Sequence, residues 1–487
     1  MEYKWTALSV TVIGTMMSGI NGRIVTIGLP TISGELHAGA SEIVWITQAY
    51  FIASTIGLLL VGRISDIYGK VKLYNIGFII FTAGSALCAL STNPYQLIGF
   101  RLIQGVGSGM LITNASAIIT DASPKTELGT MLGINQTAFR VGNVVGLTLS
   151  GVILSIVDWR GLFYVNVPVG IFGVIWAQRR LREIGKKDPS KRIDWTGFGL
   201  FTTGLTFLLL AITYLSYGVS GLVEGFAFLL IGLILLGFFI KSESRISFPL
   251  LDLRLFGIRS FAMGNVAQLL NSLAWGGLVL ILALYLEIGL GYTPLQAGLS
   301  ILPLDVTYMI FSFVGGRLSD KYGSKILTTS GLFMISLSFF VMATFGAHTQ
   351  FGEIALVLMI IGIGNGLFTP PNLKAIMGSV PPNRVGIASA FRNTMYNVGS
   401  TISYGLVVLL ITIGIPYATF TQLLQGTEQH SLLMLSQFLS GFRIAALVLG
   451  MINGIAILPS AIRGTKEIFY QDKSERGNDS HFINDPQ

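Results

Sequence analysis

The stretch GRISDIYGKVK at residues 62–72 returns as GRLSDKYGSK at residues 316–325, 254 positions later. Two shorter pairs lie 257 residues apart: GVGSG at 105–109 with GIGNG at 362–366, and NQTAFRVG at 135–142 with RNTMYNVG at 392–399. Soluble repeat proteins have far shorter periods, of roughly 20–50 residues. The sequence therefore predicts a duplication into two homologous halves.

The composition points to lipid as the main solvent of this chain. Of its 487 residues, 52% are hydrophobic and only 11% are charged, whereas a soluble domain usually carries about 25% charged residues. Fourteen apolar runs approach the roughly 20 residues that a membrane-spanning helix needs. They lie near residues 6–30, 43–61, 73–90, 96–120, 130–156, 162–178, 196–215, 226–240, 261–289, 295–314, 326–345, 354–377, 387–413 and 437–459. We expect an all-α membrane protein whose first run is a spanning helix and not a cleaved signal.

Basic residues mark one side of these predicted spans. The N-terminus, the even-numbered loops and the C-terminal tail hold 24 Lys and Arg residues, whereas the odd-numbered loops hold only Arg160. Because loops rich in Lys and Arg stay in the cytoplasm, we expect a multi-pass protein of the cell membrane with both termini cytoplasmic. The net charge of +8 then reflects topology, and nucleic acid is not expected as a partner. Anionic lipid is an alternative partner for the basic run at 179–192, but a solvated linker is the favoured interpretation.

The repeats and the runs together predict the domain organisation. Two six-helix bundles are expected, with two helices inserted between them, and this build is usual for secondary transporters. The predicted units are an N-terminal bundle at 1–178, a cytoplasmic basic linker at 179–195, the inserted helices at 196–240, a second cytoplasmic linker at 241–260, a C-terminal bundle at 261–462 and a disordered cytoplasmic tail at 463–487.

The repeated loop resembles the signature loop of the major facilitator superfamily. The matching positions are Gly62, Asp66, Gly69 and Lys70 in the first copy, and Gly316, Asp320 and Gly323 in the second. The glycines suit a tight turn between two helices. In the family, this Asp is thought to latch one half against the other by meeting a helix N-terminus, where an anion is favoured. The alternative is a charged turn with only a structural role.

Further stretches resemble the 14-helix drug:proton antiporter branch of that superfamily, which is of the multidrug efflux type. They are WITQAYFIAS at 45–54, DWRGLFYVNVPVGI at 158–171, PLLDLRLFGIRSF at 249–261 and LYLEIGLGYTPLQAGLSILP at 284–303. The resemblance covers most of residues 6–460. It implies the major facilitator fold, with two six-helix bundles plus two inserted helices.

Three features depart from that branch. Its antiporter motif on the fifth helix is expected as Gly-xxx-Gly-Pro-xx-Gly-Gly; here Gly142, Gly146 and Gly151 match, but Leu147 replaces the proline. On the first helix, the usual acidic residue is missing from the segment 21–23, which contains an arginine instead. Glu287 stands where the branch commonly has glutamine. These departures weaken a direct transfer of proton antiport to this chain.

Three charged residues are candidates for proton coupling. Asp305 lies about ten residues into its helix, near the midplane, where a carboxyl group can bind and release a proton; alternatively, a buried arginine neutralises it. Glu287 is expected at the outer end of its helix, within reach of water. Arg101 opens RLIQGVG, which resembles the family's second motif. It either takes part in coupling or pins neighbouring helices through backbone oxygens.

The other basic residues inside the spans suggest a binding cavity. Lys374 and Arg392 lie near helix ends and are expected to reach the membrane interface, whereas Arg23, Arg140 and Arg443 lie deeper. The substrate-cavity candidates are Asn21, Arg23, Gln136, Arg140, Asn393 and Asn397. A cavity lined by Arg23 and Arg140 should repel lipophilic cations and favour anionic or phosphate-bearing solutes. Alternatively, the amides engage these arginines as part of helix packing.

The sequence offers little for other classes of function. No G-x-x-x-x-G-K-[ST] loop is present to bind ATP, the four histidines lie in loops or the tail, and Cys88 is the single cysteine. We therefore expect no enzyme activity, no cofactor and no metal. The expected function is export of amphipathic solutes by proton antiport with alternating access. The alternative is an uncoupled or differently coupled exporter, or a flippase, for an anionic metabolite or lipid; a channel is disfavoured because the repeated loops serve halves that move.

Overall fold

A computed structural model describes residues 2–124, 128–184, 194–246, 253–380, 385–425 and 432–464. Within these ranges the protein is all helical, as predicted. Parts of the predicted linkers at 179–195 and 241–260, and the tail from residue 465 onward, lie outside them.

Each of the fourteen predicted spans is occupied by one long helix or by two or three consecutive shorter helices. They are α1 (Tyr3–Leu36), α2 (Ala40–Tyr68), α3 (Lys70–Ala89), α4 (Pro94–Ala122), α5 (Leu128–Ile156), α6 and α7 (Gly161–Tyr164, Asn166–Arg180), α8 (Trp195–Leu215), α9 (Leu222–Glu243), α10, α11 and the π-helix η3 (Arg259–Trp275, Leu278–Leu284, Tyr285–Gly289), α12 (Pro294–Tyr322), α13 (Ser324–Met342), α14 (Phe351–Gly378), α15 (Val385–Gly414), and α17 with α18 (Leu432–Ile455, Ile457–Ile462). Thirteen of these segments are long and apolar enough to cross a membrane, and α2, with 29 residues, is the fourteenth long helix.

Three short elements complete the described part of the chain: the 3-10 turns η1 (Gly218–Gly221) and η2 (Leu253–Gly257), and the helix α16 (Tyr417–Gln425). The run at 226–240, the shortest in the sequence, belongs to a helix of 22 residues, α9. The sequence did not predict α16, because nine residues are too few to give an apolar run.

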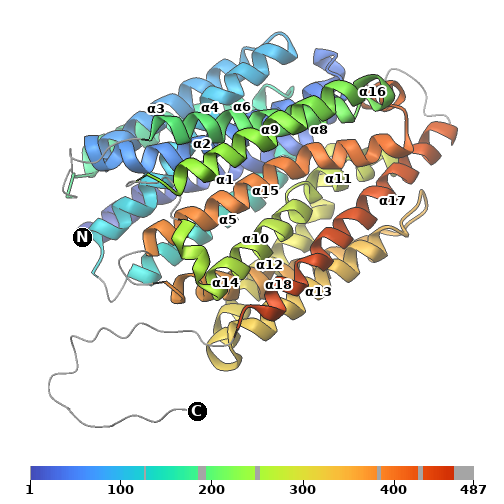
Figure 1. The fold of residues 1–487 in the computed structure, drawn as a ribbon. Coiled ribbons are helices and arrows are strands. Elements are labelled where there is room, and N and C mark those ends of the chain that lie inside the picture. Colours follow the sequence, from blue (N-terminus) through green and yellow to red (C-terminus); the bar gives the residue numbers. More distant parts are fainter. Residues whose placement is uncertain are drawn as a thin grey trace, which may run out of the picture.

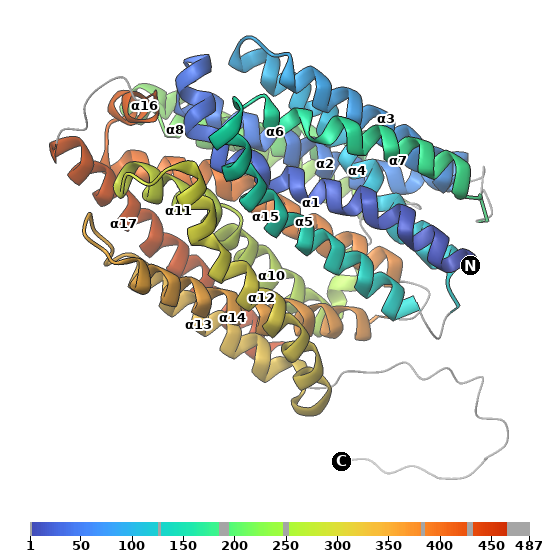
Figure 2. The ribbon, with the colours of Figure 1, turned by 180° about the vertical axis from the view of Figure 1, so that it is seen from behind.

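The two halves and the inserted helices occupy separate places. Among the described helices, α1–α7 pack mainly on one another and α10–α18 pack mainly on one another, and we refer to these two sets as the N-terminal and C-terminal bundles. The inserted helices α8 and α9 pack on one another, and α8 also contacts α2 and α15 (Figure 1). Viewed from behind, α5 lies between α1 and α12, which it contacts on either side (Figure 2). The inserted pair therefore covers one seam between the halves, while α5 and α12 form the other.

The repeated loop folds the same way in both halves. Gly69 joins α2 to α3 with φ 107°, and Gly323 joins α12 to α13 with φ 76°. Side chains disfavour this positive-φ region, which glycine adopts readily. The Gly69 N–H donates to Ser65 O at 2.9 Å, and the Gly323 N–H donates to Ser319 O at 3.2 Å. The duplication predicted from the sequence is thus present as a repeated turn.

The ends of the bundle differ in how the halves meet. We call the end with Tyr3, Gly69 and Gly323 the termini face, and the end with Gly39 and Thr293 the far face. The largest hydrophobic cluster contains buried residues from both halves, including Leu36, Trp159, Leu284, Ile415 and Phe420, which lie toward the far face. Toward the termini face, the N-terminal bundle has a separate cluster around Tyr74 and Phe78. The far face is therefore closed by a shared core.

Candidate functional site: a cavity between the halves

A cavity opens between the two halves, in the middle of the bundle and toward the termini face. It encloses about 1110 Å³ of empty space, including the part that is open to solvent, and six helices line it: α1, α2, α4, α5, α10 and α15. Its position below the shared core of the far face makes it a central site between duplicated halves, as in secondary transporters.

All the charged residues described in the cavity lining are basic. Among its described lining residues, Arg23, Arg140 and Arg392 are the only charged ones. Nη1 of Arg23 and Nε of Arg392 are buried, and neither has a hydrogen-bond partner among the described residues. Nη1 of Arg392 donates to Asn393 Oδ1 at 3.2 Å. The sequence had placed Arg392 at the membrane interface; it instead lines the cavity, because the cavity extends toward the termini face, where α15 begins. Unpaired guanidinium groups around a recess favour an anionic group of a ligand.

Aromatic rings form much of the remaining wall. Phe51 of α2 and Tyr404 of α15 stack across the two halves with ring centroids 5.3 Å apart. The guanidinium of Arg140 lies 4.5 Å from the centroid of the Tyr308 ring on α12, a cation–π contact that spans the seam between α5 and α12. Phe139 and Tyr396, which occupy equivalent positions in the two repeats, both line the cavity. The wall is therefore suited to a flat, amphipathic molecule.

Asp305 lies beside the cavity but is not among its lining residues. Its side chain is 5% exposed, and Oδ2 has no hydrogen-bond partner among the described residues. The charges of Arg23 and Arg140, both from the N-terminal half, act electrostatically on this carboxyl group, although no described ion pair within 4.0 Å joins them. The structure thus brings Asp305 together with two predicted cavity residues across the interface between the halves.

Glu287 lies in η3, above the break in its helix. Oε1 is buried and has no hydrogen-bond partner in the described part of the chain. The expectation that water reaches this carboxyl group is therefore not met for that oxygen, because Tyr285, Leu286 and Ile288 around it are buried in the shared core. Glu287 lies in a different helix from Asp305 and is not among the residues that line the cavity.

Arg101 makes the contacts expected of a pinning residue. It is 1% exposed, Nε donates to the backbone oxygen of Ile46 at 3.1 Å, and Nη1 donates to Gln104 Oε1 at 2.7 Å. Its guanidinium also lies 4.3 Å from the Tyr50 ring centroid. These contacts join α4 to α2 within one half, and a part in proton coupling stays a prediction.

The predicted amides fall into three groups. Asn393 and Asn397 line the cavity. Asn21 is fully buried and is not a lining residue; its Oδ1 accepts a hydrogen bond from Gln104 Nε2 at 3.2 Å. The side chain of Gln136 lies outside the described part of the structure. Sequence reasoning missed Asn143 and the aromatic lining residues; of these, Phe139 and Tyr396 lie within the repeated segments 135–142 and 392–399, which was the available signal.

The glycines of the antiporter-type motif bring helices into close contact. A Cβ at Gly142 would meet the backbone oxygen of Met16, and one at Gly146 would lie 2.6 Å from the backbone oxygen of Ile20, both on α1. A Cβ at Gly151 would lie 2.7 Å from the Cα of Leu295 on α12. The motif therefore packs α5 against both halves, whether or not it contributes to antiport.

A broken helix borders the cavity, and the sequence did not reveal it. α10 ends at Trp275 and α11 begins at Leu278. The hydroxyl of Ser403 on α15 fills the break: it accepts from the Gly277 N–H at 2.8 Å and donates to Leu273 O at 2.6 Å. Side chains that insert into the helical ladder in this way interrupt a helix, and interrupted helices frequently border transporter binding sites.

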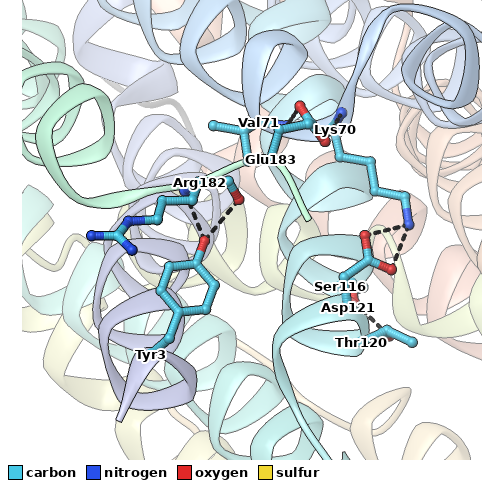
Figure 3. A network of polar contacts seen from close by, with 8 residues as sticks. All are labelled: Tyr3, Lys70, Val71, Ser116, Thr120, Asp121, Arg182 and Glu183. Carbon is cyan, nitrogen blue, oxygen red and sulfur yellow. Dashed lines mark hydrogen bonds and ion pairs between the residues drawn. The ribbon is translucent and has the colours of Figure 1, made fainter. Parts of the chain in front are cut away.

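At the termini face, the first signature loop belongs to a network within its own half (Figure 3). Lys70 Nζ pairs with Asp121 of α4 at 2.7 Å. The Glu183 carboxylate accepts from the backbone N–H groups of Lys70 at 3.0 Å and Val71 at 3.1 Å, where α3 begins and an anion is favoured. Tyr3 joins α1 to the backbone of Arg182.

The described contacts of this network do not test the predicted latch between the halves, which stays a prediction. Every contact described for Lys70 is made with the N-terminal bundle or with Glu183 at the start of the linker that follows it. The side chains of Asp66 and Asp320, and the surroundings of Gly62, lie outside the described part. Gly316 has open space where a Cβ would be.

Comparison with known proteins places the chain in a family. The model of the Major Facilitator Superfamily matches residues 11–404 and 264–462. The chain is 32% identical over 403 residues to the riboflavin transporter RibZ of Clostridioides difficile (strain 630), covering 82% of this chain and 86% of that protein. It is 29% identical over 407 residues to the multidrug transporter protein MdtP of Bacillus subtilis (strain 168), covering 82% and 73%.

Solved structures have the same fold. A bacterial homologue of the human lysosomal transporter Spinster, in an inward-facing and occupied conformation, superposes with a TM-score of 0.70 at 15% identity, over 95% of this chain and 97% of that one. The xylose transporter XylE of E. coli gives 0.61 at 15% identity, over 94% and 97%. With its fold, its central cavity and its family match, the chain belongs to the Major Facilitator Superfamily and is a membrane transporter, similar to members of the drug-efflux branch.

Proposed function

We propose that this protein is a secondary active transporter that exports amphipathic organic solutes with a negatively charged group across the cytoplasmic membrane. The observation that carries the proposal is the cavity wall, in which three arginines and several aromatic rings meet and no described lining residue is acidic. Guanidinium groups attract an anionic group, and aromatic rings cover a flat apolar body.

Transport uses alternating access of the two halves around this cavity, driven by the proton gradient through antiport. Asp305 is the proposed proton carrier, because it is buried beside the cavity and its Oδ2 lacks a described partner. Glu287 is the second candidate. The chain lacks an ATP-binding loop in its sequence, so a gradient is the proposed source of energy.

A second candidate function follows from the charges around Asp305. In this candidate Asp305 is a structural counter-ion of Arg23 and Arg140, which lie near it across the interface between the halves. The protein would then be an uncoupled or differently coupled exporter, or a flippase, for an anionic metabolite or lipid.

The substrate class is tested with purified protein in proteoliposomes. Uptake of carboxylated or sulfonated aromatic dyes is compared with uptake of lipophilic cationic dyes of similar size. Replacing Arg23 and Arg140 by Gln should weaken binding of the anionic dyes about 10- to 100-fold, since a hydrogen bond to a charged group contributes about 1.5–3 kcal/mol. Arg443→Gln is the matched control: this arginine lies inside a span, does not line the cavity, and donates to Phe345 O at 3.2 Å. An equal loss for cationic dyes would contradict the proposal.

The coupling is tested with the same vesicles. An imposed pH gradient should drive dye movement, and Asp305→Asn should abolish that dependence while a substrate gradient still drives exchange. Asp158→Asn, at an exposed carboxylate of the far face, serves as the control. If Asp305→Asn transports at the full rate with unchanged pH dependence, Asp305 is structural and the second candidate function gains support.

The orientation rests on the 24 basic residues of the predicted cytoplasmic segments. A single cysteine at exposed Lys321, in a Cys88→Ala background, should react with a membrane-impermeant reagent only from the cytoplasmic side. A cysteine at His37 should react only from outside. The reverse pattern would contradict the proposed cytoplasmic termini.

A further inference from the structure

The N-terminus of α2, at the far face, has no side-chain cap of its own. Its N-cap residue is Gly39, and the first N–H groups of any helix need acceptors from elsewhere. Ser33 and His37 shape a tight turn just before it: His37 is left-handed with φ 51°, and Ser33 Oγ donates to Ala38 O at 2.7 Å. After this turn, the first N–H groups of α2 face the C-terminal half.

The missing acceptors come from α16, which belongs to the C-terminal half. The Tyr417 hydroxyl accepts from the Ser41 N–H at 2.8 Å, and the Thr421 hydroxyl accepts from the Ala40 N–H at 3.4 Å. The two hydroxyl-bearing residues are four positions apart, so they lie on one face of α16. A Cβ at Gly39 would lie 3.6 Å from Tyr417 Oη and 3.6 Å from Thr421 Cγ2. The cap of α2 is thus built across the two halves.

An apolar face of α16 packs into the core that both halves share, against α1 and α2 as well as α17. Phe420, Leu423 and Leu424 are buried in the shared core, and the Phe420 ring stacks on Phe438 of α17 with centroids 6.4 Å apart. Tyr417 also contacts Tyr217, in the turn between α8 and α9, at a centroid distance of 4.8 Å. α16 lies between α15 and α17 of the C-terminal half in the chain, and its contacts bridge to α1 and α2 and, through the Tyr417 ring, to the turn between the inserted helices.

We propose that α16 is a latch of the far face: Tyr417 and Thr421 hold the start of α2, and these two hydrogen bonds must break before the cavity can open toward the far face. The latch rests on the alternating access of the proposed function, but not on the charge of the substrate. Its two hydrogen bonds bias the protein toward the conformation that is open at the termini face.

The test measures accessibility without any substrate. A reporter cysteine replaces Ser54, which lines the cavity near the middle of α2, in a Cys88→Ala background. A membrane-impermeant thiol reagent is applied to right-side-out and inside-out vesicles. Tyr417→Phe with Thr421→Val removes both acceptors and nearly preserves volume. We expect the ratio of far-face to termini-face labelling to rise about fivefold for each bond removed.

Two matched controls separate the latch from a general loss of hydroxyl groups. Thr412→Val removes a hydroxyl that bonds Leu409 O within its own helix, and Tyr217→Phe keeps the ring that touches Tyr417; both should leave the ratio within twofold of the parent. If the double variant is not inserted into the membrane, the single variants Tyr417→Phe and Thr421→Val provide the test. Each should raise the labelling ratio about fivefold. A ratio within twofold of the parent in the latch variants would overturn the proposal. A raised ratio together with failed dye transport would support the latch and count only against the proposed substrate.

Discussion

The two faces of this transporter hold the halves in opposite ways. At the far face the contacts cross between the halves: the Tyr417 hydroxyl accepts from the Ser41 N–H, and the Thr421 hydroxyl accepts from the Ala40 N–H. At the termini face, the described network of Lys70 and Glu183 stays inside the N-terminal half. The halves share their repeated turns, so duplication alone does not explain this difference. The contacts that each face adds to the repeat determine which face is closed.

The largest effect is expected when a bulky side chain is introduced where α5 meets α12 at the far face. Gly151→Leu places a side chain where a Cβ would already lie 2.7 Å from the Cα of Leu295, so α5 and α12 must separate. Such overpacking costs about 1–3 kcal/mol, and transport should fall at least tenfold because the far face no longer closes. Transport in proteoliposomes and Tm in detergent provide the measurements. Gly99→Leu is the control, since a Cβ there meets nothing within 4 Å; an equal loss in both variants would contradict a special role for this seam.

A smaller effect is expected from the stacked pair that joins the halves at the cavity. Phe51→Leu or Tyr404→Leu removes a stack with centroids 5.3 Å apart, and such pairs contribute about 0.5–1.5 kcal/mol. The ratio of far-face to termini-face labelling of the Ser54 reporter should rise about two- to tenfold. Because both changes remove the same contact, the double variant should shift the ratio no further than the larger single variant. Additive shifts would show that the pair does not act as a unit.

The network of the termini face should have a weaker and different effect. Lys70→Gln removes an ion pair whose side chains are 20% and 22% exposed, which should lower stability by no more than about 1 kcal/mol. Since the pair lies within one half, the labelling ratio of the Ser54 reporter should not change. Asp121→Asn should reproduce the result. A shift of the ratio in either variant would show that the signature loop also sets the balance between the faces.

The smallest effect is expected from pH at the latch. Burial raises the pKa of Tyr417 above the ordinary tyrosine value of about 10. Since the neutral form is favoured in the folded state, its contribution is fully present below the unfolded pKa and is lost only as pH rises through the folded pKa. Between pH 6 and 9, the difference in labelling ratio between the parent and Tyr417→Phe should therefore stay constant. A difference that vanishes within this range would mean that another titrating group controls the latch.

The sequence predicted the fold better than the site. Fourteen helices followed from the apolar runs because length and hydropathy decide what crosses a bilayer, and the repeated turn at Gly69 and Gly323 followed from glycines in equivalent positions. α16 was missed because nine residues give no such signal. Its place depends on contacts with α2, some 376 residues away in the chain, which local patterns do not report.

Within the cavity, the sequence identified residue types more reliably than their positions. Arg23, Arg140, Asn393 and Asn397 do line the cavity, since charged and amide groups inside a span turn toward a polar interior. Arg392 was placed at the interface because it lies only seven residues from the start of α15, but the cavity extends toward that end of the helix. Asn21 was named as a cavity candidate together with Arg23, but residues two positions apart on a helix point in different directions.

The hydroxyl of Ser403 makes one helix depend on another for its continuity. Because α15 supplies the bonds that α10 and α11 lack at their junction, a displacement of α15 by a bound solute pulls on both segments at once. The same displacement would reach Glu287, because η3 directly follows α11 in the chain. A change in cavity occupancy would be carried toward Glu287 through this hydroxyl together with the close packing of Gly276 on Ser400 of α15.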